Sequence, residues 1–304
     1  MQNGGMENIM KIKVSWAQRI FDFFNVIFMC VLAIVMIYPV WHVIMASLSD
    51  NNMLIGYTGM LLKPMGFSIN AYKLMIKDSM IATGYLNTIF IVVVGVSLNL
   101  LFTSIAAYFL SRKNVYWQKH VMFFIVVTMF FSGGTIPFYL FVTQTLKLNN
   151  SLWALILPAL INTYNMIIMR TSFQAIPDSL EEAARIDGAS HWTVLFKIVL
   201  PLSKAIIAVM CLYYAVGHWN SWFNASLFIK DREKYPLQLI LREILIINDT
   251  NTMTQGSGDA AEKMSIAETV KYAVVVTGTL PILCLYPFLQ KYFVKVVMIG
   301  SVKG

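Results

Sequence analysis

Long apolar runs, interrupted by few charges, constrain this chain more than any other feature of its sequence. Of the 304 residues, 58% are hydrophobic and only 12% are charged. A run of about 20 apolar residues is long enough to cross the hydrocarbon core of a bilayer as a helix. Several such runs occur, and a helix satisfies its own backbone hydrogen bonds in lipid. The sequence therefore predicts an all-α, polytopic integral membrane protein with a single domain over residues 1–304.

Six apolar segments are long enough to be predicted as transmembrane helices. They cover residues 24–46, 86–110, 121–146, 152–169, 202–229 and 272–293. Glycine or proline interrupts several of them, at Gly133, Gly134, Pro137, Pro158, Pro281 and Pro287. Proline removes a backbone donor and kinks a helix, and the freed carbonyls need partners in lipid. These breaks fit either a static bundle with local kinks or a bundle that bends or lines a pathway.

The net charge of +8 is interpreted as a sign of membrane orientation, and no nucleic-acid partner is expected. If both termini are cytoplasmic, the inner segments carry almost all of the excess positive charge, as the positive-inside rule requires. The prediction is a multi-pass protein of the cytoplasmic membrane. The cysteines lie singly in apolar runs and the histidines lack metal-ligand spacing, so no metal site is expected.

A polar segment from Glu181 to Pro201, EEAARIDGASHWTVLFKIVLP, stands out in this apolar chain. Ser179 and Glu182 have the spacing of a capping box at the start of a helix after Pro177. Glu181 and Arg185 are four residues apart and are expected to pair on the helix surface. Gly188 is expected to end the helix in the left-handed conformation. The pattern predicts a two-turn helix over Leu180 to Asp187.

A second helix is predicted after Ser190, which can cap it. Its apolar residues Trp192, Leu195, Phe196 and Val199 have the spacing of a single stripe, and Pro201 marks the junction with the fifth span. The first helix is shorter than the ~12–15 residues that hold a helix together alone, so something must pack on it. Either the unit docks into a groove of another protein, or it folds back on its own bundle.

The spacing of seven residues in this segment, Glu182, Ala183, Ala184, Gly188, Ile198, Leu200 and Pro201, resembles the EAA loop of ABC-importer permeases. The resemblance implies the type I importer permease fold and coupling helices over 178–201. In that family these helices sit in a cleft of a dimeric ATP-hydrolysing subunit. The residues expected to couple to the ATPase are Glu181, Glu182, Ala183, Ala184, Arg185, Asp187, Gly188, Ile198, Leu200 and Pro201.

The stretches IPDSLEEAARIDGAS and YFVKVVMIGSVKG are similar to the carbohydrate-uptake branch, more narrowly to the smaller permease of the maltose type. This implies a sugar or oligosaccharide substrate, a second permease subunit and an extracytoplasmic solute-binding protein. It also implies that the last outer loop, 230–271, contacts the binding protein. The C-terminal residues expected to touch the ATPase are Gly300, Ser301, Lys303 and Gly304. Val296 departs from the glycine that related tails carry, which puts the path of the tail in doubt.

The chain contains no GxxxxGK[ST], HExxH or GxSxG motif. A transport subunit without its own ATPase site is therefore expected, binding no cofactor, with ATP and Mg on the partner ATPase. Two alternatives are an importer permease for another solute, such as an amino acid or polyamine, and a secondary transporter. The latter would need intramembrane carboxylates, and the predicted spans contain none.

The outer half of the fifth span, LYYAVGHWNSWFNASLF, is rich in aromatic and amide side chains, which suit a sugar. Aromatic residues also collect at the membrane–water interface, so an aromatic belt is an alternative. Asn220 and Asn224 are expected on one helix face, and SGGTIPFY in the third span is expected to bend at the pathway. The candidate pathway residues are Tyr213, Tyr214, Trp219, Asn220, Trp222 and Asn224.

Overall fold

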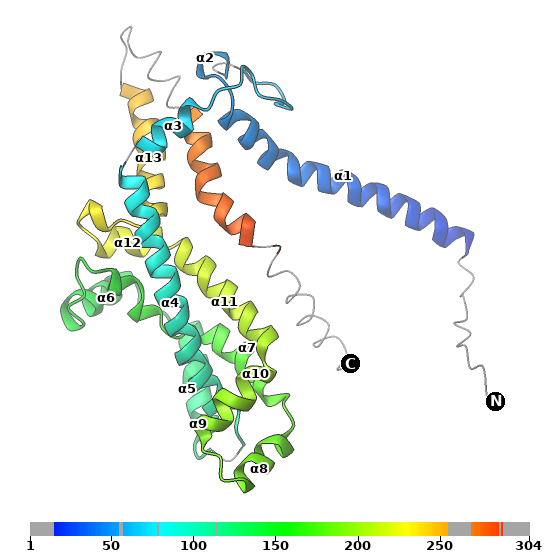
Figure 1. The fold of residues 1–304 in the computed structure, drawn as a ribbon, viewed down its shortest axis with the longest axis vertical. Coiled ribbons are helices and arrows are strands. Elements are labelled where there is room, and N and C mark those ends of the chain that lie inside the picture. Colours follow the sequence, from blue (N-terminus) through cyan, green and yellow to red (C-terminus); the bar gives the residue numbers. More distant parts are fainter. Residues whose placement is uncertain are drawn as a thin grey trace.

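The computed structural model describes residues 15–54, 57–77, 79–113, 115–254, 269–285 and 287. Within these ranges the regular elements are helices, apart from one isolated bridge between Ser49 and Phe67, and the all-α prediction is confirmed (Figure 1). The α-helices are α1 (Trp16–Ser47), α2 (Asn51–Leu54), α3 (Asn70–Lys77), α4 (Ser79–Ser111), α5 (Gln118–Phe130), α6 (Thr135–Leu140), α7 (Thr163–Gln174), α8 (Asp178–Ile186), α9 (His191–Val194), α10 (Leu200–Leu202), α11 (Lys204–Trp219), α12 (Trp222–Phe228), α13 (Leu237–Thr254) and Thr269–Leu285. The short turns are η1 (Phe141–Thr145) and η4 (Leu195–Val199), both π-helical, and the 3-10 turns η2 (Leu152–Leu155), η3 (Leu157–Ala159) and η5 (Arg232–Lys234).

Helix α4, 33 residues long, is the axis of the bundle and runs along most of its length (Figure 1). It packs against α7, α11 and α13. Small or polar side chains on α4, among them Gly95, Asn99, Thr103 and Ala107, are buried in these contacts. Small residues let helices approach closely, and polar ones form hydrogen bonds across the interface. The core therefore lies along one face of α4.

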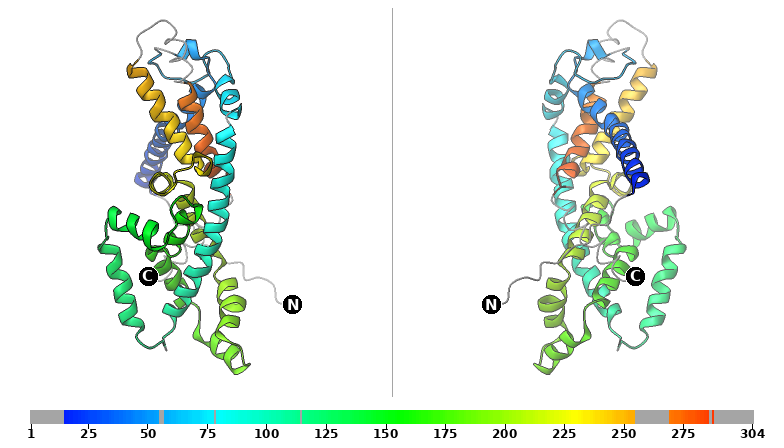
Figure 2. Two further views of the ribbon diagram at one scale, coloured as in Figure 1. Left: turned by 90° about the vertical axis from the view of Figure 1, so that its left-hand side faces the viewer. Right: turned by 90° about the vertical axis from the view of Figure 1, so that its right-hand side faces the viewer.

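Helix α1 stands away from the bundle (Figures 1 and 2). It is 32 residues long and apolar, yet only Met45, Ala46 and Ser47 at its C-terminal end are buried. A helix that is apolar all round is normally covered by lipid or by protein. The apolar surface of α1 is therefore left for a bilayer or another chain.

By length and composition, α1 and α4 can each cross a membrane. Three bent pairs raise the number to five if each pair is one span: Gln118–Phe130 with Thr135–Thr145 (114°), Leu152–Ala159 with Thr163–Gln174 (46°), and His191–Leu202 with Lys204–Trp219 (86°). The apolar helix Thr269–Leu285 is shorter, and most of the rest of the predicted sixth span lies outside the described residues. The number of six spans stays a prediction.

Three of the predicted spans are not single straight helices. Residues 121–146 turn sharply where Gly134 adopts a φ of +86°, as the glycines predicted. Residues 152–169 begin as two 3-10 turns around Pro158, and the side chain of Asn162 caps α7 by accepting a hydrogen bond from the Asn165 N–H (3.1 Å). Residues 202–229 divide into α11 and α12 at Asn220. The placement of Asn220 and Asn224 on one face of a continuous helix was therefore wrong, because Asn220 is the C-cap of α11 and Asn224 lies in α12.

Within the loop 230–271, the segment LQLILREILI forms the first part of α13 and packs on the bundle. Leu237, Ile240 and Leu241 are buried against a cluster that includes Ile81 of α4 and Ala273 of the helix Thr269–Leu285. Residues 255–268 of this loop lie outside the described residues.

Candidate functional site

The predicted helix–turn–helix unit (178–201) consists of α8, a turn at Gly188, α9 and η4, and it lies at the lower end of the molecule in Figure 1. Gly188 has a φ of +81°, the left-handed conformation that the sequence predicted. The N–H groups of Gly188 and Ala189 donate to the carbonyls of Arg185 (3.0 Å) and Ala184 (2.9 Å), which completes the end of α8. The Ser190 hydroxyl accepts from the Thr193 N–H (3.2 Å), so the predicted cap of the second helix is confirmed.

The capping box predicted from Ser179 and Glu182 does not form. Helix α8 begins at Asp178, directly after Pro177, so Ser179 is already inside the first turn, and no side chain caps the helix. The Asp178 carboxylate instead accepts a hydrogen bond from the Lys113 ammonium (2.7 Å), across the gap to the end of α4. The capping box is absent because the helix starts one residue too early for Ser179 to be its N-cap.

The predicted coupling residues divide between an exposed and a covered face. Glu182, Ala183, Arg185, Asp187, Gly188 and Pro201 are exposed. Ile186, which the sequence reading did not single out, is 87% exposed. Ala184, Ile198 and Leu200 are half-buried, and Ala184 and Leu200 pack against the main core. Glu181 was predicted on the contact face, but it is buried. Ala183 is therefore open to a partner, whereas Ala184 is partly covered.

The predicted apolar stripe of the second helix is not a single buried stripe. Leu195 and Val199 are buried together with Val194, as core residues. Trp192 and Phe196 are exposed and stack on each other, with ring centroids 6.1 Å apart. The π-helical turn η4 changes the angular positions of residues along the helix. Among the described residues, Trp192 and Phe196 therefore form an exposed apolar surface on the unit.

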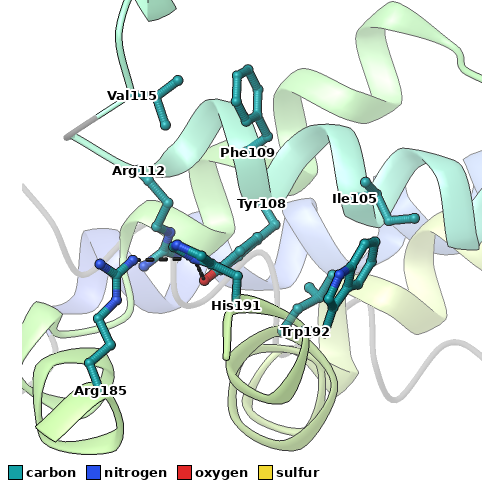
Figure 3. A pocket seen from close by; sticks show the side chains of 9 residues that line it. Ile105, Tyr108, Phe109, Arg112, Val115, Arg185, His191 and Trp192 are labelled. Carbon is teal, nitrogen blue, oxygen red and sulfur yellow. Dashed lines mark hydrogen bonds between the residues drawn. The ribbon is translucent and has the colours of Figure 1, made fainter. Parts of the chain in front are cut away.

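Glu181 is the centre of a charged cluster formed by Tyr108, Arg112, Glu181, Arg185 and His191. Its carboxylate pairs with the Arg112 guanidinium and, at 2.8 Å, with Arg185, so the pair predicted four residues apart is confirmed. The Tyr108 hydroxyl donates to Glu181 Oε1 (3.1 Å). A hollow of about 480 Å³ opens beside the cluster (Figure 3), lined by Ile105, Tyr108, Phe109, Arg112, Val115, Arg185, His191, Trp192 and Leu195.

The neighbouring pair of Lys113 and Asp178 is exposed to solvent. The hydrogen bond from Lys113 lowers the pKa of the Asp178 carboxyl, and Asp178 in turn raises the pKa of Lys113. Both groups are therefore charged at neutral pH.

Two of the candidate pathway residues have their polar atoms engaged inside the bundle. Tyr214 is buried, and its hydroxyl lies 2.7 Å from Thr103 Oγ1 and accepts from the Asn162 N–H (3.2 Å). The Trp219 indole N–H donates to the Gly278 carbonyl (2.9 Å). These contacts hold α11 to α4, α7 and the helix Thr269–Leu285.

The other four candidates lie nearer the surface. Tyr213 and Asn220 are exposed, and Asn224 is half-buried. The Trp222 ring is covered on one face by the Arg242 guanidinium, 3.7 Å from the ring centroid. A separate hollow of about 470 Å³ lies at the bend of SGGTIPFY, lined by Ser132, Gly133, Gly134, Thr135, Pro137, Phe138, Phe141, Phe223 and Leu227. The role of all six residues in a pathway stays a prediction.

The predicted tail residues Gly300, Ser301, Lys303 and Gly304 lie outside the described residues, as does Val296.

Sequence reasoning missed two groups that organise the site. Arg112 follows an apolar run and was counted only among the charges that orient the chain. Asn99 lies inside an apolar run and is buried, with its amide donating to the Leu160 carbonyl (2.9 Å) and its oxygen 2.6 Å from His218 Nε2. A polar residue within a membrane segment is expected to face the bundle, and that signal could have identified Asn99.

Residues 99–298 match the family model described as "Binding-protein-dependent transport system inner membrane component". The chain is 40% identical to the polygalacturonan/rhamnogalacturonan transport system permease protein YtcP of Bacillus subtilis (strain 168) over 289 residues, covering 94% of this chain and 99% of that protein. It is 26% identical to the maltodextrin transport system permease protein MalD of Streptococcus pneumoniae (strain ATCC BAA-255 / R6), over 98% of this chain and 100% of MalD.

The fold is similar to a chain in the crystal structure of a bacterial ABC transporter involved in the import of the acidic polysaccharide alginate. The TM-score is 0.82 and the sequence identity 31%, over 92% of this chain and 98% of that one.

Proposed function

Since this chain belongs to the family of binding-protein-dependent transport system inner membrane components, we propose that it carries an oligosaccharide across the cytoplasmic membrane. It is a membrane protein and a permease component of an ABC importer, and as such a transport component and not an enzyme. The finer assignments below concern its substrate, its partners and its orientation.

The proposed substrate is an oligosaccharide that contains sugar acids. The relative YtcP is named for polygalacturonan and rhamnogalacturonan, and the similar crystal structure is that of a transporter involved in the import of an acidic polysaccharide. Both are more similar in sequence to this chain than the maltodextrin permease MalD is. Galacturonate oligosaccharides are therefore the first solutes to test.

The proposed energy source is a separate dimeric ATP-binding subunit that docks on the helix–turn–helix unit and carries ATP and Mg. One observation supports this most directly: Ile186 is 87% exposed beside Glu182, Ala183 and Asp187, although α8 has only nine residues. A helix of that length depends on tertiary packing, and among the described residues this packing is on its Glu181 side. The opposite face, which carries Ile186, is exposed and is the proposed contact surface for a partner. No cofactor is assigned to this chain itself.

A second permease subunit, different in sequence, is also proposed. The exposed apolar surface of α1 supports it, because side chains are exposed along nearly the full length of this helix. We assign α1 to contact with lipid on one side and with the second permease on the other. An extracytoplasmic solute-binding protein is the proposed partner of residues 230–271, and the tail Gly300–Gly304 is proposed to reach the ATPase. Both termini are proposed to be cytoplasmic, with six spans.

The test uses the transporter assembled from this chain, the second permease and the ATPase in proteoliposomes. Ile186→Cys is expected to form a crosslink to the ATPase during active import of a galacturonate oligosaccharide. Ile76→Cys in α3 is the matched control, because Ile76 is 82% exposed at the opposite end of the bundle (Figure 1). Failure of Ile186→Cys to capture the ATPase in an importing membrane would refute the docking assignment.

The same preparation separates the alternatives. ATP-dependent uptake of an amino acid or a polyamine, but of no oligosaccharide, would assign another solute. Uptake driven by an ion gradient without ATP would assign a secondary transporter.

A further inference from the structure

The charged cluster links the helix–turn–helix unit to α4 by a route that bypasses the polypeptide chain. Glu181 of α8 pairs with Arg112, which follows the last residue of α4, although the two are 69 positions apart. Both side chains are largely covered, with 12% of Arg112 and 10% of Glu181 exposed. Two charges held in so dry a place must stay paired, because separating them leaves an uncompensated buried charge.

Further hydrogen bonds extend the cluster to α7 and α9. Arg112 NH2 donates to the Phe173 carbonyl at the end of α7 (3.3 Å), and Arg112 lies over the Tyr108 ring (4.9 Å). The Tyr108 hydroxyl is 3.3 Å from His191 Nδ1 at the start of α9, and Arg185 is 3.3 Å from the same nitrogen (Figure 3). The ends of four helices therefore meet at one buried ion pair.

On its N-terminal side, α8 follows α7 after residues 175–177 alone. The covalent route from the other end of α8 to α11 is less direct. From α8 the chain passes the Gly188 turn, the π-helical turn η4 and an 86° bend before α11 begins at Lys204. Each of these is a place where a helix axis changes direction, so a displacement of α8 can be absorbed before it reaches α11. The ion pair has no such intermediate segment, since α8 contacts the end of α4 itself.

We infer that Arg112 and Glu181 are positioning residues that join α8 and the adjoining end of α4 into one rigid body. This inference rests on the proposed function and adds to it a path for the movement imposed by the ATPase. A displacement of α8 then moves α4, and because α4 packs against α7, α11 and α13, the movement reaches the far end of the bundle. The docking face of α8 and the joint to α4 are separate surfaces of the same short helix.

The exposed pair of Lys113 and Asp178 provides a matched control. It also joins the end of α4 to α8, at 2.7 Å, but its side chains are 82% and 55% exposed. An exposed ion pair is screened by water and contributes little. Asp178→Asn therefore removes an ion pair between the same two elements without disturbing a buried charge.

The first experiment measures solute transported per ATP hydrolysed in the reconstituted transporter, with a galacturonate oligosaccharide as the probe. Glu181→Gln and Arg112→Gln are expected to retain the ATPase on co-purification and to lower transport per ATP at least ~5-fold, the lower end of measured coupling between sites. The double exchange of Arg112→Glu with Glu181→Arg is expected to recover part of the loss, and Asp178→Asn to behave as wild type. Glu181→Gln with wild-type transport per ATP would overturn the inference.

A second experiment leaves the buried pair intact, so it does not depend on how well the variants fold. Lys113→Cys and Asp178→Cys are joined by a short bifunctional thiol reagent, in a background where Cys30, Cys211 and Cys284 are replaced by serine. If α8 and α4 move as one body, the joined protein transports as well as the unjoined one. Loss of transport on joining would mean that the two elements move relative to each other, and the inference would fall. If wild-type protein neither binds an ATPase nor transports, the proposed function itself fails, and the inference with it.

Discussion

Replacing Gly188 by alanine isolates the backbone cost of the turn between α8 and α9. With φ at +81°, the residue is in the left-handed region, where an L-residue with a Cβ costs about 1–2 kcal/mol. An added Cβ would meet no atom within 4 Å, so no steric clash with neighbours adds to that cost. The expected weakening is therefore about 1–2 kcal/mol, equivalent to about a 5–30-fold change in a folding equilibrium.

Hydrogen exchange of the α8 amides reports this change. In the assembled transporter, Gly188→Ala is expected to speed exchange over residues 178–187 by about 5–30-fold. Gly188→Asn is expected to change it less, because asparagine adopts the left-handed conformation more readily. Gly188→Asp tolerates the same backbone but adds a charge beside Asp187, so comparison with Gly188→Asn measures the effect of charge alone. Equal exchange in the alanine and asparagine variants would refute the argument from backbone conformation.

Three further predictions concern other parts of the chain. Gly95→Ala is expected to destabilise the protein by about 1–3 kcal/mol, because the added Cβ would lie 2.6 Å from His218 Nε2. Gly217→Ala in α11 meets no atom within 4 Å and is expected to stabilise the protein by up to about 1 kcal/mol. Thermal unfolding of the two variants checks this difference in sign. The Asp178 pKa is lowered, so any contribution of its charged form is complete above the usual carboxyl pKa of about 4 and is lost only as pH falls through the lowered value. The ratio of the α8 exchange rates in Asp178→Asn and wild type is therefore expected to stay constant from about pH 6 to about pH 8, and a ratio that changes across this range would contradict the assignment. Deleting residues 255–266 is expected to weaken the stimulation of ATP hydrolysis by the solute-binding protein while the bundle stays folded. Deleting residues 237–246 is expected to unfold the bundle, because Leu237, Ile240 and Leu241 are buried. Unchanged stimulation after the first deletion would remove the proposed role of that loop.

Local patterns predicted the parts of the fold that depend on neighbouring residues. The turn at Gly188, the cap at Ser190 and the pairing of Glu181 with Arg185 all involve residues at most four positions apart, and all three are present. The break near Gly134 likewise follows from one residue's conformational freedom. Such features follow from local geometry, whatever packs around them.

Where a local pattern competed with a distant partner, the distant partner decided. The capping box at Ser179 did not form because the helix starts directly after Pro177, which places Ser179 inside the first turn. Glu181 has the helical spacing of a surface residue, yet Arg112 and Tyr108 draw it inward. Trp192 and Leu195 belong to one apolar stripe in the sequence, but Leu195 is buried and Trp192 is exposed, because the helix changes its pitch at η4.

By itself, the sequence determined the apolar segments of the chain, its all-α fold class, the position of the helix–turn–helix unit and the left-handed conformation of Gly188. Only the tertiary structure decided which face of α8 is covered and which is open, and that Arg112, directly after α4, pairs with Glu181 on the covered face. The physical reason is that helical periodicity places residues on faces but cannot say what lies opposite. A buried charge shows its role only when its counter-charge, 69 positions away, is brought beside it.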